Sequence, residues 1–234
     1  MAKRNVQQAF GRDLSYGVAA RPIGPKTKRQ FSRERNVRPG DMPQRGFNVG
    51  DAKFLDIAQA TYDNNTTGSI THLDVVPRGT GVNARIGKAF VPTSLQIQGH
   101  VSTDSESATV HWANYLVWDL SPNQALPAIT DILDAGNSLA FPKRENSHRF
   151  KIIRRFHGVL SGPNSTATGQ EQITDVQEYV RMPKGIVSMC TSTDEAGTIG
   201  SRVTGALYLI STGNKGAGTV DATSTLTMRL NYME

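Results

Sequence analysis

From residue 53 onward, apolar residues occur in short runs that alternate with polar ones and are separated by turn-forming residues. The alternation is clearest in residues 224–232, STLTMRLNY, where Leu226, Met228, Leu230 and Tyr232 alternate with Thr227, Arg229 and Asn231. A period of two predicts strands with one face against a core and one face toward solvent. The pattern predicts eight strands, at residues 54–62, 69–76, 92–103, 109–119, 148–160, 173–182, 205–211 and 224–232.

Helical spacing of apolar residues occurs in a single short stretch, residues 127–133 (PAITDIL). This stretch belongs to a long connection, residues 120–147, and long connections in compact domains are usually functional or surface decoration. Eight strands with loops of uneven length predict an all-β fold, a single eight-stranded antiparallel jelly-roll sandwich over residues 50–234. An up-and-down barrel would have shorter, more even loops, and a propeller would need an internal repeat that the sequence lacks.

The first 49 residues differ from the rest in charge and in pattern. They contain eleven Lys and Arg and three acids, a net charge of +8, whereas residues 50–234 carry fifteen basic and seventeen acidic residues, a net charge of −2. Four prolines, several glycines and no sustained periodicity leave too little apolar surface to offset the chain entropy lost on folding. We therefore predict a largely disordered basic arm, residues 1–49, in front of the folded domain.

The arm has the chemistry of a nucleic-acid-binding segment. Arginine dominates, and its guanidinium group makes forked contacts with phosphate oxygens. Aromatic rings among the basic residues can stack on unpaired bases. A solvated tail or a nuclear-import signal is the alternative, and residues 25–29 (PKTKR) would suit import as well as binding. The predicted phosphate-binding residues are Lys3, Arg4, Arg12, Arg21, Lys26, Lys28, Arg29, Arg33, Arg35, Arg38 and Arg45, and the stacking candidates are Phe10, Tyr16 and Phe31.

Cysteine content and hydropathy narrow the class of protein further. Cys190 is the single cysteine, so an intramolecular disulfide is excluded, which is typical of a reducing compartment without proving one. No apolar run reaches the roughly 18 residues of a membrane span, and no membrane partner is expected. The N-terminus lacks the apolar stretch of a secretory signal, so the sequons at Asn64, Asn65 and Asn164 are expected to be unused.

No motif in the chain predicts catalysis, a cofactor or a metal. The five histidines form no H-E-x-x-H pattern, and none lies near Cys190 in the sequence. Residues 79–81 (GTG) lack the Gly-Lys-Ser/Thr of a phosphate loop, and residues 158–162 (GVLSG) do not match a nucleophile elbow. Asp131 and Asp134 would suit a calcium site at a subunit boundary, or they are ordinary helix-surface acids. We predict no enzyme, no catalytic residue, no cofactor and no metal.

One set of motifs resembles a known family. Residues 79–87 read G-T-x-x-x-x-R-x-G, carried by Gly79, Thr80, Arg85 and Gly87. The segments YLVWD, PAITDIL, HRFKIIRR and ALYLIS follow, at residues 115–119, 127–133, 148–155 and 206–211. Their order behind a basic arm, over residues 53–234, resembles the coat proteins of small circular single-stranded DNA viruses that encode a rolling-circle replication protein. The geminivirus-like branches are more similar than the animal circoviruses.

The resemblance implies a single jelly roll, an icosahedral shell of 60 or more copies and packaging of circular single-stranded DNA. It also implies a place in the virion and, during assembly, in the host nucleus, reached through the host import machinery. The sequence departs from these families at two points, which leaves the host and any movement function open. The arm is less dense in arginine than in circovirus coat proteins, and the Cys/His zinc-finger patterns of geminivirus type are missing.

Four basic residues of the body remain open to two interpretations. Arg149, Lys151, Arg154 and Arg155 belong to the fifth predicted strand and would line the interior of a shell, or would face solvent on an ordinary sheet surface. Alternatives for the whole protein also remain. These are a nonviral nucleic-acid-binding β-protein, an RNA-virus coat protein of the same plan, and a β-sandwich lectin or enzyme with an incidental basic leader.

Overall fold

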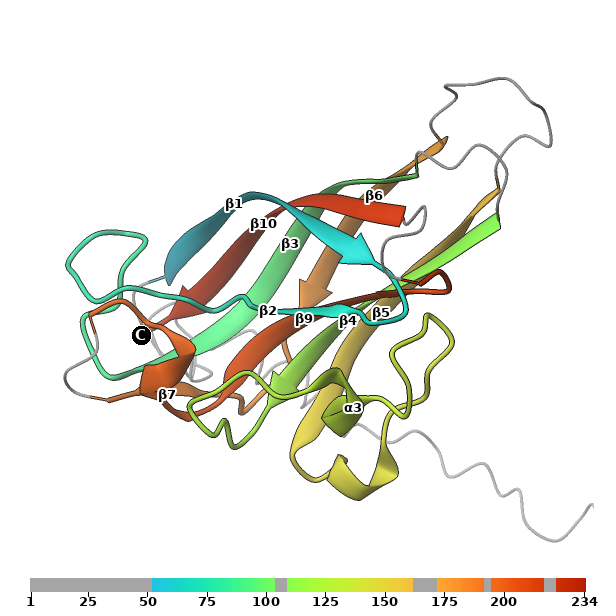
Figure 1. The fold of residues 1–234 in the computed structure, drawn as a ribbon. Helices are drawn as coiled ribbons and strands as arrows, with labels where there is room; N and C mark the ends of the chain where they lie inside the picture. Colours follow the sequence, from blue (N-terminus) through green and yellow to red (C-terminus); the bar gives the residue numbers. More distant parts are fainter. Residues whose placement is uncertain (1–51, 104–108, 162–171, 192–194, 217–221) are drawn as a thin grey trace, which may run out of the picture. The chain divides into compact units, whose positions relative to one another are not determined.

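The computed structural model describes residues 52–103, 109–161, 172–191, 195–216 and 222–234 (Figure 1). Within these residues the regular structure is ten strands, one helical turn and two short 3-10 turns. No described helix is long and apolar enough to cross a membrane. The strands are β1 (Ala52–Asn64), β2 (Ser69–His72), β3 (Ala89–Thr103), β4 (Thr109–Asp119), β5 (Phe150–Ser161), β6 (Gln172–Arg181), β7 (Ser188–Cys190), β8 (Arg202–Thr204), β9 (Ala206–Gly213) and β10 (Ala222–Met233), and the helix is α3 (Ile129–Ile132).

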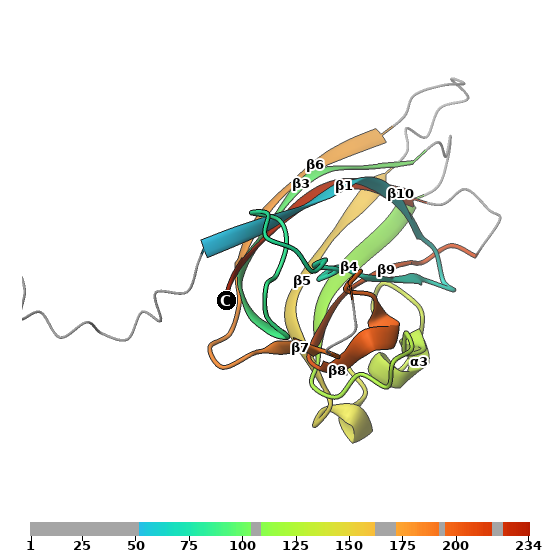
Figure 2. The same ribbon diagram turned by 90° about the vertical axis from the view of Figure 1, so that its left-hand side faces the viewer.

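The strands form two antiparallel sheets that pack face to face (Figures 1 and 2). One sheet begins with the order β1-β10-β3. The other edge of β3 pairs with β6 along most of its length and with β7 at its start. Strand β7 also pairs with β8. The other sheet has the order β2-β9-β4-β5. Apart from β4 with β5 and β7 with β8, strands that follow one another in the sequence are not paired with each other. This is jelly-roll connectivity, and the predicted fold class is confirmed.

Alternating side chains of both sheets make the core between them. On β3 and β10 the inward residues are buried, as Leu95 and Leu230 are, while the neighbouring Gln96 and Arg229 are exposed. Trp118 of β4 enters the same core from the facing sheet. Burial of one such side chain contributes about 1.5–3 kcal/mol, so this layer is the main source of stability.

The β2-β9-β4-β5 sheet is covered on its outer face as well. The connection between β4 and β5 folds back across it, and α3 lies outside the sheet in both views (Figures 1 and 2). Ile132 and Leu133 pack there against Tyr115 and Ile210 in a second apolar cluster. Strand β9 is consequently buried at every position, which explains why its sequence is apolar or small without alternation.

All eight predicted strands are present, with changes at their ends. The strand predicted at residues 69–76 ends at His72, because Asp74 turns into the interior instead of continuing the ladder. The third strand begins at Ala89, before Pro92, and the proline is accommodated because the pairing with β10 shifts beside it. The three-residue strands β7 and β8 were not predicted, since runs that short carry no readable period.

The helix predicted at residues 127–133 is reduced to the single turn α3. Leu133 has an extended conformation and forms an isolated bridge with Pro142, so the backbone leaves the helix to pair across the connection. The basic arm, with its predicted disorder, lies outside the described residues.

Candidate nucleic-acid interface

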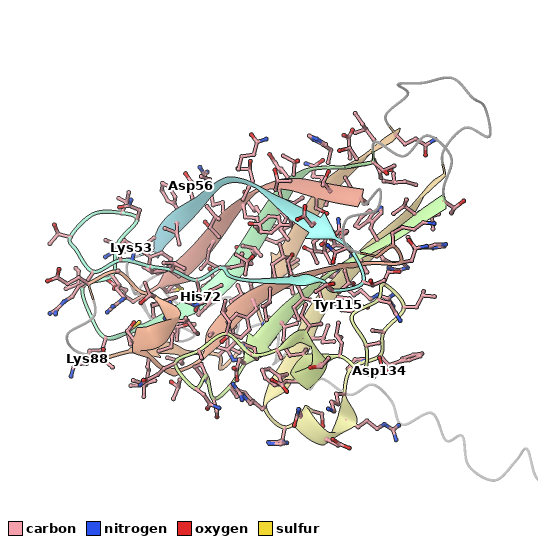
Figure 3. All side chains as sticks on the ribbon, viewed as in Figure 1. Lys53, Asp56, His72, Lys88, Tyr115 and Asp134 are labelled. Carbon is pink, nitrogen blue, oxygen red and sulfur yellow. The ribbon has the colours of Figure 1, made fainter. Side chains whose placement is uncertain are left out.

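The described chain starts at an anchored position. Lys53 is almost fully buried, and its Nζ donates to the Ala84 carbonyl oxygen at 2.9 Å and to Glu234 Oε2 at 2.7 Å. The other carboxylate oxygen of Glu234 accepts from the amide of Ile86 at 2.6 Å. These bonds tie the start of β1, labelled at Lys53 in Figure 3, to the loop before β3. The eleven basic residues of the arm and Phe10, Tyr16 and Phe31 precede this point and lie outside the described residues, so their role remains a prediction.

Arg149 is committed to an internal partner. Its Nε and one terminal nitrogen donate to the two carboxylate oxygens of Asp119 at 2.9 and 2.8 Å, and its guanidinium lies 4.6 Å from the centre of the Phe150 ring. The hydrogen bonds that Arg149 donates to Asp119 raise the pKa of Arg149. Asp119 is fully buried at the end of β4. Arg149 therefore neutralises the buried Asp119 carboxylate. A phosphate group would have to compete with Asp119 for the Arg149 guanidinium.

Arg155 is also used inside the molecule. Its guanidinium donates to the Ser138 carbonyl oxygen at 2.6 Å and lies 5.3 Å from the centre of the Tyr115 ring. The Tyr115 hydroxyl donates to the carbonyl oxygens of Ser138 and Ala140 at 3.4 and 3.2 Å, and burial raises the pKa of this tyrosine. Arg155 and Tyr115 thus hold the connection between β4 and β5 against the sheet.

Arg154 and Lys151 remain accessible. Arg154 makes an ion pair of 3.1 Å with Glu178 of β6, and its side chain is still about half exposed. Lys151 is exposed. Arg149 precedes β5, and neighbouring positions of a strand such as Arg154 and Arg155 point to opposite faces, so the four basic side chains do not gather on one surface. For Arg154 and Lys151 both interpretations therefore remain: they line the interior of a shell, or they face solvent on an ordinary sheet surface.

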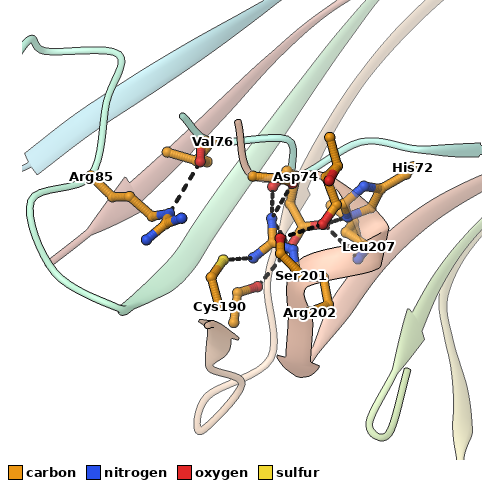
Figure 4. Close-up of polar contacts among 11 residues, drawn as sticks. His72, Asp74, Val76, Arg85, Cys190, Ser201, Arg202 and Leu207 are labelled. Atoms are coloured by element: carbon orange, nitrogen blue, oxygen red, sulfur yellow. Dashed lines mark hydrogen bonds and ion pairs between the residues drawn. The ribbon is translucent and has the colours of Figure 1, made fainter. Parts of the chain in front are cut away.

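A buried polar network lies where β2, β7 and β8 meet (Figure 4). Asp74 is fully buried, with its two carboxylate oxygens accepting from the Leu207 amide at 3.0 Å and from the Ser188 hydroxyl at 2.6 Å. Nε2 of His72 lies 2.6 Å from the same carboxylate, and the guanidinium of Arg202 lies 3.6 Å away. The carboxylate is thus surrounded by polar groups from four segments of the chain, one of them the Arg202 guanidinium.

The network is charged under ordinary conditions. Burial alone would raise the pKa of Asp74, but Arg202, His72 and the Leu207 amide outweigh it and lower that pKa to about 2. Arg202 is itself fully buried, donates to the Asp74 carbonyl oxygen and to Cys190 Sγ, and stacks over the Phe90 ring at 5.1 Å. The network fixes the short strands β7 and β8 to the rest of the domain.

The remaining predicted candidates serve local structure. Asp131 accepts from the Ala128 amide at 3.0 Å, and Asp134 accepts from the Phe141 amide at 2.8 Å. Neither carboxylate is part of a larger cluster, because the described residues contain no group of three or more His, Cys, Asp or Glu that could hold a metal ion. The interpretation of these two residues as ordinary surface acids fits their contacts.

Sequence reasoning missed the Asp74 network. One signal was readable, since Asp74 interrupts the apolar segment LDVV at residues 73–76, and a charge among apolar residues suggests a buried partner. The identity of that partner was not readable, because Arg202 lies 128 residues away from Asp74.

Comparison with known proteins gives one family. Residues 6–234 match the model of the geminivirus coat protein/nuclear export factor BR1 family. The capsid protein of tomato yellow leaf curl Sardinia virus is 29% identical over 111 residues, covering 44% of this chain and 43% of the relative. The capsid protein of tomato golden mosaic virus, strain Yellow vein, is 28% identical over 135 residues, covering 55% and 53%. The matches therefore span about half the length of these relatives.

Solved structures that match include those from infectious bursal disease virus. The match to the structure of its Gx strain covers 78% of this chain and 33% of the viral chain, at 10% sequence identity and a TM-score of 0.30. The match to its VP2 subviral particle covers 79% of this chain and 34% of the viral chain, at 11% identity and a TM-score of 0.26. Similarities this low imply nothing about function.

Proposed function

The chain belongs to the geminivirus coat protein/nuclear export factor BR1 family, and on this premise we propose that it is the subunit of an icosahedral shell that packages circular single-stranded DNA. The family description names two kinds of protein, and the relatives given above are capsid proteins. The protein is a structural component rather than an enzyme. A jelly roll suits this role, because it is a compact block with loops at both ends for contacts between copies.

The split of charge along the chain is the observation that carries the packaging proposal. The first 49 residues hold a net charge of +8, whereas the remainder holds −2. Each phosphate neutralised by Lys or Arg releases condensed counterions, so the arm would bind without regard to sequence and would weaken steeply with salt. One arm binds weakly, but 60 arms in one cavity would supply about 480 positive charges, and multivalency then makes weak contacts sufficient.

The contacts of the body support this division of labour. Two of the four basic residues proposed to line an interior, Arg149 and Arg155, already have internal partners. Arg154 is shared with Glu178, which leaves Lys151 as an exposed cation of that strand. These four residues therefore offer a nucleic acid little that competes with the arm, and we assign DNA binding mainly to residues 1–49. Import into the host nucleus, through residues 25–29, belongs to the same proposal.

Particle formation and DNA retention test the proposal. The full chain should form closed particles by electron microscopy that protect DNA from added nuclease, and DNase and RNase treatment after disruption should identify the packaged strand as DNA. A chain lacking residues 1–49 should remain folded and lose the protected DNA. A matched variant with Phe10, Tyr16 and Phe31 replaced by Leu keeps the arm's charge, so it should retain most of the DNA.

Three results would contradict the proposal. The full chain would stay monomeric at all concentrations tested, the particles would hold no nuclease-protected DNA, or the arm deletion would retain DNA as well as the full chain does. Protected RNA in place of DNA would favour the alternative of an RNA-virus coat protein.

A further inference from the structure

One layer of the interior between the two sheets is polar. Asn64 of β1 and Ser224 of β10 enter it from one sheet, and Asn114 of β4 and Ser211 of β9 enter it from the other. All four residues are fully buried. Ser69, at the start of β2, joins them, and its hydroxyl oxygen is also out of reach of solvent. We call these five residues the polar layer.

Strand register explains why three of these side chains meet. Ser69 pairs with Ser211, and Ser211 pairs with Asn114, so they form one row across β2, β9 and β4. Residues that are directly opposite each other in a sheet point to the same face. Along β4 the inward positions before and after Asn114 are Trp112 and Leu116, which both belong to the apolar core. The row therefore interrupts an inward face that is apolar on both sides of it.

The two asparagines of the polar layer converge on one hydroxyl group. Nδ2 of Asn64 donates to Ser224 Oγ at 2.5 Å, and Nδ2 of Asn114 donates to the same oxygen at 3.1 Å. The second of these bonds joins the two sheets, because Ser224 lies on β10 and Asn114 on β4. The backbone beside Asn64 is also held, since the Gly213 amide donates to the Asn65 carbonyl oxygen at 2.8 Å. The amide groups are therefore fixed inside the layer.

Much of the hydrogen-bonding capacity of the polar layer is unused by the protein. Four of its buried polar atoms have no partner within the part of the chain that the structure describes: Oδ1 of Asn64, Oδ1 of Asn114, Oγ of Ser69 and Oγ of Ser211. A buried polar atom without a partner destabilises the folded state, and buried polar groups in native proteins are almost always hydrogen-bonded. Four such atoms in one layer therefore indicate a shared partner.

The four atoms define the chemistry of that partner. The two amide oxygens can only accept hydrogen bonds, so each requires a proton donor, whereas the two serine hydroxyls can donate. Water offers two donors and two acceptors, which matches this set one for one. A metal ion suits the layer less well, because none of the five residues is a carboxylate that would balance a buried positive charge. Three of the five are serines, which fill less space than the apolar side chains at the neighbouring inward positions.

We propose that the polar layer is a binding site for an ordered water molecule that joins the two sheets. The water donates to Oδ1 of Asn64 and Oδ1 of Asn114 and accepts from the hydroxyls of Ser69 and Ser211. Buried waters typically make two to four such bonds to groups that lack protein partners, and they are costly to remove. The water links β1 of one sheet to β2, β9 and β4 of the other. The inference concerns the folded domain and does not depend on shell formation.

The sign of a stability change tests the site in solution. Ser211→Ala removes a hydroxyl that bonds to no group of the described chain. If that hydroxyl had no partner at all, its removal would relieve a buried polar atom and leave stability unchanged or higher. With the water in place a hydrogen bond is lost, so the equilibrium constant for unfolding of the full chain should rise about fivefold. Ser69→Ala should act in the same direction, and urea unfolding measures both.

Two matched variants calibrate this measurement. Ser121→Ala removes an exposed hydroxyl and should leave the unfolding equilibrium unchanged. Thr212→Val removes a buried hydroxyl that donates to the Ala113 carbonyl oxygen at 3.2 Å, so it shows the cost of losing one direct bond in this region. If Ser211→Ala and Ser69→Ala leave the unfolding constant unchanged or lower it, while Thr212→Val raises it, the water bridge is wrong.

A high-resolution experimental structure of the full chain shows the site directly. We expect one rounded density peak within hydrogen-bonding distance, about 2.7–3.2 Å, of at least three of the four atoms. The peak should not change when sodium in the buffer is replaced by rubidium. A peak that becomes stronger in rubidium would identify a monovalent cation and overturn the proposal. Direct hydrogen bonds among the four atoms, with no density between them, would overturn it as well.

Discussion

Asp74 and Asp56 each pair with an arginine from a distant strand, but their surroundings are opposite. The side chains of Asp74 and Arg202 are fully buried, whereas those of Asp56 and Arg229 are 54% and 49% exposed (Asp56 is labelled in Figure 3). The exposed pair has the better geometry, two hydrogen bonds at 2.5 and 2.9 Å, while the nearest carboxylate–guanidinium distance of the buried pair is 3.6 Å.

A third pair lies between these extremes. Asp119 is fully buried and its partner Arg149 is 22% exposed. The three pairs form a series in which access to water decreases, and each joins a carboxylate to a guanidinium group. An exposed pair exchanges water for a partner with little net gain, whereas removing one member of a buried pair leaves a charge without water or partner. Burial rather than distance should therefore rank their contributions to stability.

The largest effect is expected at the buried pair. Asp74→Ala leaves Arg202 charged and unpaired in the interior, so the free energy of unfolding should fall by about 3–5 kcal/mol. Urea unfolding followed by the fluorescence of Trp112 and Trp118, both in the core, measures the change. Asp63→Ala, which removes an exposed carboxylate of β1, is the control and should leave the midpoint unchanged. A loss below about 1 kcal/mol for Asp74→Ala would contradict the ranking by burial.

An intermediate effect is expected for Arg149→Met. The substitution keeps much of the packing on Phe150 and removes both hydrogen bonds to the buried Asp119 carboxylate. A hydrogen bond to a charged group contributes about 1.5–3 kcal/mol. Because Arg149 is 22% exposed, water can replace part of what the two bonds supply, so the same unfolding experiment should show a loss of about that size rather than twice it. If the loss equals that of Asp74→Ala, partial access of water to Arg149 does not reduce the loss of stability. The pairs would then fall into two classes, exposed and buried, rather than three.

Acid should reveal the buried pair through its protons. The pKa of Asp74 is lowered to about 2, so this carboxylate stabilises the folded state when the pH is above its ordinary pKa of 3.8. That stabilisation is lost as the pH falls from about 4 to about 2, and it amounts to about 2 kcal/mol. The free energy of unfolding of Asp74→Asn should depend less steeply on pH in this window than that of the original protein. Identical slopes would show that the folded-state pKa is not depressed.

The smallest effect is expected at the exposed pair. Asp56→Asn removes an ion pair that both partners can replace with water, so the thermal midpoint should not change beyond the error of measurement. The hydrogen bonds from Arg229 lower the pKa of Asp56, but both groups are exposed and added salt screens their attraction. Calorimetry at low and high salt checks this, and a clear drop confined to low salt would mean that the pair contributes after all.

The strands were predictable because their signal is local. The alternation in residues 224–232 matches the buried and exposed faces of β10 residue by residue, and the charge split at residue 49 is visible from composition alone. Strand β9 was also found, although it lacks alternation, because a run of apolar residues between turns is typical of a strand buried on both faces. The roles of single polar residues were not predictable to the same degree. Arg149 and Arg155 read as free cations in the sequence, yet they hold a buried carboxylate and a carbonyl oxygen.

The sequence by itself determined the all-β class, the number of long strands and the separation of a cationic segment from a nearly neutral body, because periodicity and composition are properties of neighbouring residues. Only the tertiary structure decided that Asp74 meets Arg202 and that Arg155 holds the connection between β4 and β5 against the sheet. It also decided that Leu139 and Phe141 remain exposed. These depend on residues far apart in the chain being brought together, and on which atoms water still reaches.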